Sequence, residues 1–142
     1  MHKYSKTAVL CCNCPKSYNF AAEKTRIYGN MRKKIAVFAS GSGTNFQQIC
    51  EYFQQSDKAQ VDILIVNKKD AYVRERAKAL GIEQRYFTRE DFYNSDKIVD
   101  LLTLRKTDLI VLAGFLWLVP QNLLAAFPNK IVNIHPALLP AY

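Results

Sequence analysis

Short strand-like blocks alternate with amphipathic blocks along the chain from residue 34 onward. The strand-like blocks end at glycines, asparagines or charged residues, as short buried strands do. The blocks between them carry apolar residues at helical spacing. Five blocks predict strands, at 35–39, 61–66, 82–87, 109–113 and 130–134, and four predict helices, at 45–53, 72–80, 95–105 and 120–127. This alternation predicts an α/β fold with a doubly wound, Rossmann-like, mostly parallel sheet.

The helical blocks show which faces turn inward. In the first of them Phe46, Ile49, Cys50 and Phe53 share one face. Gly81 is expected to stop the second helix, and Pro120 to sit in the first turn of the last one. The third helix is expected to bury a set of aliphatic residues, Ile98, Val99, Leu101 and Leu102.

Ligands of such sheets bind beyond the carboxyl ends of the strands. Four segments follow the predicted strands at that edge, 40–45, 67–70, 114–119 and 133–142. Residues that bind or react with a ligand are therefore expected in these segments.

The positive charge is concentrated at the N-terminus. The chain has 142 residues and a net charge of +8, of which +7 falls in residues 1–34 and +1 in residues 35–142. We interpret residues 1–30 as a basic, disordered extension, weakly similar to an organelle presequence, and residues 31–142 as one domain. A nearly neutral fold argues against nucleic-acid binding. The longest apolar run, 109–119, is too short to span a bilayer, so no membrane association is expected.

Cysteine usage indicates a cytoplasmic protein without disulfides. Cys11, Cys12 and Cys14 crowd the N-terminal extension, and Cys50 falls in a predicted helix. Together with the distant His2, the first three make a poor zinc site, so free thiols and no bound metal are expected.

A glycine-rich loop directly follows the first predicted strand. It reads Ser-Gly-Ser-Gly-Thr-Asn over residues 40–45 and leads into a helix. Glycines allow close backbone approach, and a helix N-terminus offers free amides and partial positive charge. The loop lacks the Lys-Ser/Thr pair of a Walker sequence and the full dinucleotide fingerprint. We predict that Gly43, Thr44 and Asn45 bind a small phosphate ester; a tight turn without a ligand is the alternative.

The last predicted strand carries Asn133 and His135. Side chains two positions apart on a strand point to the same face, so these two would share one site. Histidine exchanges a proton near neutral pH, and an amide stabilises a carbonyl oxygen. The pair therefore suits acyl transfer, whereas a histidine held by a loop hydrogen bond is the simpler explanation.

The loop after the fourth strand is rich in large apolar residues. Core packing accounts for some of them, and an apolar wall beside backbone amides also suits a flat heterocycle. The residues concerned are Leu116, Trp117, Leu118 and Val119.

Four segments together resemble the phosphoribosylglycinamide formyltransferase family in order and spacing. They are 39–47 (ASGSGTNFQ), 66–71 (VNKKDA), 108–115 (DLIVLAGF) and 133–140 (NIHPALLP). The resemblance covers residues 33–142. It implies a formyltransferase-type sheet and transfer of a formyl group from 10-formyltetrahydrofolate, the cosubstrate, to the amine of glycinamide ribonucleotide in purine biosynthesis, without a metal, by a monomer or homodimer.

The resemblance also implies residue roles. Gly43, Thr44 and Asn45 would bind the phosphate of the ribonucleotide. The folate pterin would contact Leu116, Trp117, Leu118, Val119 and Asn133. Asn133 would also orient the formyl group, and His135 would be the acid–base residue. A folate-contacting arginine of the family falls within the stretch 88–97, where Arg89 is an imperfect equivalent.

The resemblance stops where family members continue. They carry a mobile loop, a catalytic aspartate that pairs with the histidine, and further strands, so the sequence is interpreted as a form truncated on its C-terminal side, with impaired activity. Three other functions stay open: formyltetrahydrofolate hydrolase, methionyl-tRNA formyltransferase, and a phosphate-ester binding fragment without activity.

Overall fold

The computed structural model describes residues 32–134. They belong to the second of the two units into which the chain divides, Met1–Asn30 and Met31–Tyr142. The described part holds a five-stranded sheet whose paired strands are all parallel, in the order β3-β2-β1-β4-β5. The strands are β1 (Lys33–Ala39), β2 (Ala59–Val66), β3 (Glu83–Tyr86), β4 (Leu109–Ala113) and β5 (Ile131–Ile134). The predicted α/β fold is confirmed.

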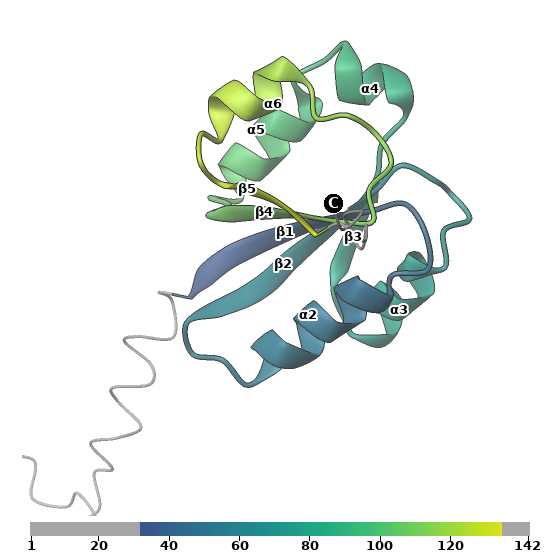
Figure 1. The fold of residues 1–142 in the computed structure, drawn as a ribbon, viewed down its shortest axis with the longest axis vertical. Coiled ribbons are helices and arrows are strands. Elements are labelled where there is room, and N and C mark those ends of the chain that lie inside the picture. Colours follow the sequence, from purple (N-terminus) through teal and green to yellow (C-terminus); the bar gives the residue numbers. More distant parts are fainter. Residues whose placement is uncertain (1–31, 135–142) are drawn as a thin grey trace, which may run out of the picture. The chain divides into compact units, whose positions relative to one another are not determined.

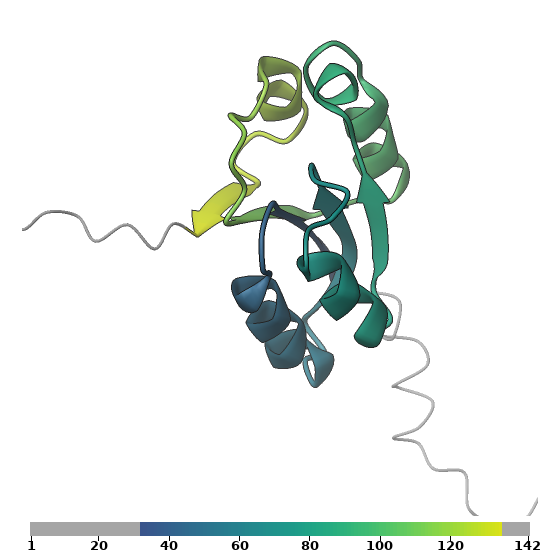
Figure 2. The ribbon, with the colours of Figure 1, turned by 90° about the vertical axis from the view of Figure 1, so that its right-hand side faces the viewer.

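Helices cover both faces of the sheet (Figures 1 and 2). On one face lie α2 (Thr44–Gln54) and α3 (Val73–Ala79). The other face carries α4 (Arg89–Tyr93), α5 (Lys97–Leu104) and α6 (Gln121–Ala126). In chain order, β2 and β3 are added on one side of β1, and the chain then crosses back to add β4 and β5 on the other side. The strand order therefore reverses between β1 and β4, which is where ligands of doubly wound sheets bind.

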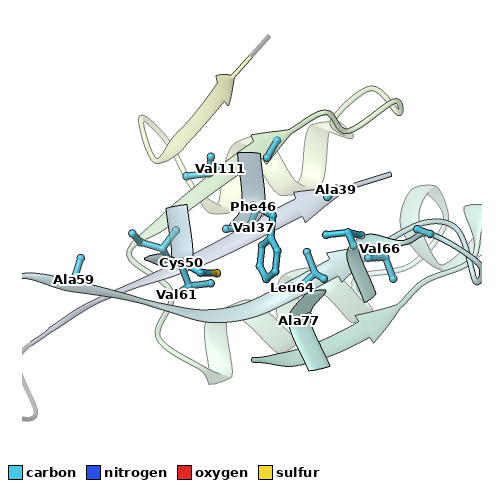
Figure 3. Packing of buried hydrophobic residues seen from close by; sticks show 14 residues of the cluster. Val37, Ala39, Phe46, Cys50, Ala59, Val61, Leu64, Val66, Ala77 and Val111 are labelled. Carbon is cyan, nitrogen blue, oxygen red and sulfur yellow. The ribbon is translucent and has the colours of Figure 1, made fainter. Parts of the chain in front are cut away.

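Each layer of helices encloses its own hydrophobic cluster. Alternate residues of β1 divide between them, with Val37 facing α2 and α3 and Phe38 facing α4 to α6. Figure 3 shows the first cluster, in which Phe46 and Cys50 of α2 rest on the sheet. Because β1 is buried on both faces, its sequence is an unbroken apolar run from Ile35 to Ala39.

The predicted helix faces are confirmed. Phe46 and Cys50 are buried, and Ile98 and Leu102 of α5 are buried on the opposite side. Gly81, with φ of +68°, ends α3 as expected. The N–H of Gly81 donates to Lys78 and that of Ile82 to Ala77, which together form a Schellman motif.

Helix α4 was not expected. Its start is explained by Thr88, whose Oγ1 accepts the N–H of Asp91 at 3.1 Å. The helix buries Phe92 against the second cluster. At the start of α6 the expectation was off by one position, since Pro120 is the N-cap residue and its carbonyl accepts the N–H groups of Leu123 and Leu124.

Candidate functional site

The loop after β1 makes a close turn against α3. Gly43 caps α2 with φ of +76°, a conformation that favours glycine. A Cβ added to Gly43 would lie 2.3 Å from Cγ2 of Val73, far inside van der Waals contact. Packing against α3 therefore requires a glycine here, independently of any ligand.

The first turn of α2 is open at its N-terminal end. No side chain caps it, and the first backbone bond of the helix runs from the N–H of Gln47 to the carbonyl of Gly43. Thr44 is exposed and Asn45 half-buried. The N–H groups of a first helical turn lack intrahelical acceptors and carry partial positive charge, so this end of α2 suits an anion. The structure thus brings Gly43, Thr44 and Asn45 together.

A hydrogen bond connects the loops that follow β1 and β4. Ser40 is 1% exposed, and its Oγ accepts the N–H of Leu116 at 3.0 Å. Gly114, with φ of +70°, turns the chain out of β4 before this contact. The two loops that flank the reversal of strand order are therefore fixed to each other. Sequence reasoning missed this role of Ser40, because a serine in a polar loop gives no signal of a partner 76 residues away.

The apolar loop after β4 divides into half-buried and exposed positions. Trp117 and Val119 pack against the second cluster, where the ring centroid of Trp117 lies 5.3 Å from that of Phe92. Leu116 and Leu118 are 71% and 83% exposed. Core packing thus accounts for the first pair, and the second pair is available to a ligand.

A groove beside Leu118 is lined by residues of α4. The hydroxyl of Tyr93 donates to the carbonyl of Leu118 at 3.1 Å. The guanidinium of Arg89 lies 5.6 Å from the centroid of the Tyr93 ring. A cation, the carboxylate of Glu90, an aromatic ring and an exposed leucine therefore meet at the edge of the apolar loop.

Asn133 lies on β5, next to the end of β4. It pairs in register with Leu112, whose side chain belongs to the second cluster, so Asn133 is on the face covered by α4, α5 and α6. Asn133 is exposed to solvent. His135 lies outside the described residues, so its shared face with Asn133 stays a prediction.

The loop after β2 brings a buried polar side chain to this edge of the sheet. Asn67 follows β2 as Ser40 follows β1, and within residues 32–134 its buried side-chain amide has no hydrogen-bond partner.

The Cys50 thiol lies on the buried face of α2. Burial raises its pKa to about 12, and the nearby Glu51 adds to the shift. Cys50 is therefore unsuited to act as a nucleophile.

Among residues 32–134, no group of three or more His, Cys, Asp or Glu side chains is placed to hold a metal ion. No helix in this part of the chain has the length and apolar character needed to cross a bilayer. Cys11, Cys12, Cys14 and His2 lie outside the described residues.

A family profile described as formyl transferase matches residues 33–142. The chain belongs to the formyl transferase family. The match includes both loops at the reversal of strand order and the whole of β5.

Relatives within this formyl transferase family carry a more specific name. The phosphoribosylglycinamide formyltransferase of Haemophilus influenzae is 44% identical over 115 residues, covering 78% of this chain and 54% of the relative. The chloroplastic enzyme of the same name from Arabidopsis thaliana is 43% identical over 117 residues, covering 78% of this chain and 40% of the relative. The chain thus spans about half the length of the curated relatives it matches.

A solved structure supports the fold directly. Glycinamide ribonucleotide transformylase 1 of Geobacillus kaustophilus superimposes with a TM-score of 0.70 at 43% identity, covering 78% of this chain and 61% of the other. The formyltransferase-type sheet expected from the sequence is therefore confirmed.

Proposed function

We propose that this chain is the N-terminal part of a phosphoribosylglycinamide formyltransferase. The enzyme would transfer the formyl group of 10-formyltetrahydrofolate to the amine of glycinamide ribonucleotide, in purine biosynthesis. The observation that carries the proposal is the match to relatives of that name at 40–44% identity, across the elements that surround the reversal of strand order.

The loop before α2 would bind the phosphate of the ribonucleotide. Gly43 lets the backbone approach, and the amides of Thr44 and Asn45 belong to the open first turn of an 11-residue helix. Because the cap is supplied by no side chain, these donors remain available to phosphate oxygens.

The formyl group would be transferred near Asn133. The glycinamide nitrogen attacks the formyl carbon and forms the new C–N bond, and the bond from that carbon to N10 of the folate then breaks. The amide of Asn133 would donate to the formyl oxygen as it gains negative charge. His135 would take the proton lost by the attacking amine and return one to the departing N10.

The folate would lie along the apolar loop. Leu116 and Leu118 expose their side chains, while Trp117 and Val119 would support the pocket from beneath. Arg89 would bind a carboxylate of the folate tail, since its guanidinium lies at the groove that Leu118 also lines.

The competing reactions differ in their product. The chain is assayed alone and mixed with the C-terminal half of the Haemophilus influenzae relative, with 10-formyltetrahydrofolate as donor. We expect formylated glycinamide ribonucleotide from the mixture and little product from the chain alone. Release of formate without transfer would indicate a hydrolase, and formylated methionyl-tRNA would indicate the tRNA enzyme. If the mixture binds the ribonucleotide but forms no product, the chain is a phosphate-ester binding fragment without activity.

Phosphate binding is tested separately by calorimetry with glycinamide ribonucleotide. Asn45→Ala keeps the backbone N–H but removes the side-chain amide, a further donor that would reach the phosphate, and should weaken binding. Gln48→Ala, on an exposed position of the same helix, should leave binding unchanged. Equal affinities for both variants would contradict the phosphate assignment.

For the whole protein we propose a cytoplasmic location, a monomer or homodimer, and partners limited to the two substrates, without nucleic acid or membrane. The near-neutral charge of residues 35–142 supports the exclusion of nucleic acid. Sedimentation tests the oligomeric state, and imaging of a tagged chain tests the location; transport of the tagged chain into an organelle would contradict the latter.

A further inference from the structure

Helix α3 contacts two backbone carbonyls of the phosphate loop, residues 40–45, which are proposed to bind phosphate. The N–H of Val73 donates to the carbonyl of Gly41 at 3.1 Å, and Nε of Arg76 donates to the carbonyl of Ser42 at 2.8 Å. Helices α2 and α3 lie side by side on one face of the sheet (Figures 1 and 2). Two consecutive carbonyls of the loop are therefore directed toward α3.

The direction of these carbonyls determines where the loop amides point. In a trans peptide the C=O and the following N–H point in opposite directions. With the Gly41 and Ser42 carbonyls toward α3, the N–H groups of Ser42 and Gly43 point away from it. The Gly43 carbonyl accepts from Gln47 along α2, so the Thr44 N–H points beyond the helix N-terminus. Successive amides presented in this way form an anion-binding concavity.

Arg76 is fixed on both sides of its contact with the loop. Its Nη1 donates to Oε1 of Gln47 on α2, and its guanidinium stacks on the Tyr72 ring, 5.1 Å from the ring centroid. Both hydrogen-bond acceptors, the Ser42 carbonyl and the Gln47 amide, are uncharged. These contacts hold the guanidinium in place without neutralising its charge.

We propose that Arg76 is a positioning residue of the phosphate loop, and this inference rests on the proposed function. By holding the Ser42 carbonyl, Arg76 directs the Gly43 N–H toward the phosphate. The planar guanidinium of Arg76 has several N–H donors, so it contacts Ser42, Gln47 and the Tyr72 ring at the same time. A lysine ammonium cannot make all of these contacts.

The test uses the full chain and calorimetry with glycinamide ribonucleotide. Arg76→Gln is expected to weaken binding roughly ten- to a hundredfold, as loss of a charge-assisted hydrogen bond does. Arg76→Lys keeps the charge and should recover only a small part of that affinity. Arg74→Gln is the matched control, because Arg74 lies on the same helix and donates instead to Gln84 and to the Lys69 carbonyl. It is expected to change affinity less than about threefold, because neither of its contacts involves the loop before α2.

A second measurement, NMR of the protein without ligand, reports on the backbone of the phosphate loop. The ¹H–¹⁵N resonance of Gly43 should shift in Arg76→Gln and stay in place in Arg74→Gln, while thermal unfolding reports whether each variant folds. Full rescue by Arg76→Lys, equal losses in the Arg74 and Arg76 variants, or an unshifted Gly43 resonance would overturn the positioning role and leave the proposed function standing. Absence of binding by the unaltered chain would overturn the phosphate site itself, and the role of Arg76 with it.

Discussion

Ser40 and Leu116, 76 positions apart, are joined by a 3.0 Å hydrogen bond at the point where the strand order of the sheet reverses. The donor is the backbone N–H of Leu116 and the acceptor is the hydroxyl oxygen of Ser40, which is almost fully buried. The bond ties the loop proposed to bind phosphate to the loop proposed to bind folate. Their separation is thus set by the protein before any substrate arrives.

Replacing Ser40 by alanine should loosen this connection. The Leu116 N–H loses its acceptor, and an unsatisfied, partly buried donor costs about 1–3 kcal/mol in the free energy of unfolding. Urea denaturation measures the loss. The control is Ser42→Ala, an exposed position whose hydroxyl only contacts that of Thr44 at 3.4 Å, and its effect should stay within about 0.5 kcal/mol. Equal stability of the two variants would show that the Ser40 hydroxyl is dispensable.

Alanine at Gly43 should destabilise the fold, even without ligand. The variant combines a left-handed backbone, worth about 1–2 kcal/mol, with overpacking against Val73, worth about 1–3 kcal/mol. Gly81→Ala is the control, because φ is +68° there as well but a Cβ would meet nothing within 4 Å. Denaturation should show a clearly larger loss for Gly43. A similar loss for both would mean that Val73 yields easily. Loss of phosphate binding in Gly43→Ala therefore does not by itself identify a ligand contact.

Acid should weaken the contact between β1 and the residue before β4. The backbone N–H of Lys34 and, to a smaller extent, the ammonium of Lys33 hold the pKa of the Asp108 carboxyl below its ordinary value of 3.8. A carboxyl whose pKa is lower in the folded state adds stability above its unfolded pKa, and this stability is lost as the pH falls through the folded pKa. The loss is expected below about pH 4.

The variant Asp108→Asn isolates this contribution. It should lower stability at pH 7 by about 1 kcal/mol or less, because the ion pair is largely exposed, and it should flatten the decline of stability in acid. Urea denaturation at several pH values measures both effects. An unchanged acid profile would show that other carboxyls govern it.

The Cys50 thiol should resist alkylation in the folded protein. It is 3% exposed, and burial raises its pKa to about 12, so little thiolate forms at pH 8. Peptide mapping after treatment with iodoacetamide measures its labelling, with glutathione in the same tube as the reference thiol. Labelling should become complete only in denaturant. Reaction at the rate of glutathione under native conditions would contradict the burial of this side chain.

The sequence by itself determined the order and type of most elements. Apolar runs such as 35–39 and 109–113 can be buried on both faces only in a parallel sheet covered by helices, so the α/β fold followed from local pattern. Phe46 and Cys50 indicated the buried face of α2, and Gly81 the end of α3, because helical spacing and a left-handed cap are local properties. The family resemblance was likewise carried by short segments of fixed order.

Only the tertiary structure decided which residues meet. The Ser40 bond to Leu116, the contact of Arg76 with Ser42 and the fit of Val73 beneath Gly43 all join residues that are far apart in sequence. It also divided the apolar loop, packing the half-buried Trp117 against the second cluster and exposing Leu118, and it formed α4 where a loop was expected. These contacts and exposures depend on how the helices pack against the two faces of the twisted sheet. Hydrophobic periodicity identifies an inward side chain, but packing alone selects its neighbour.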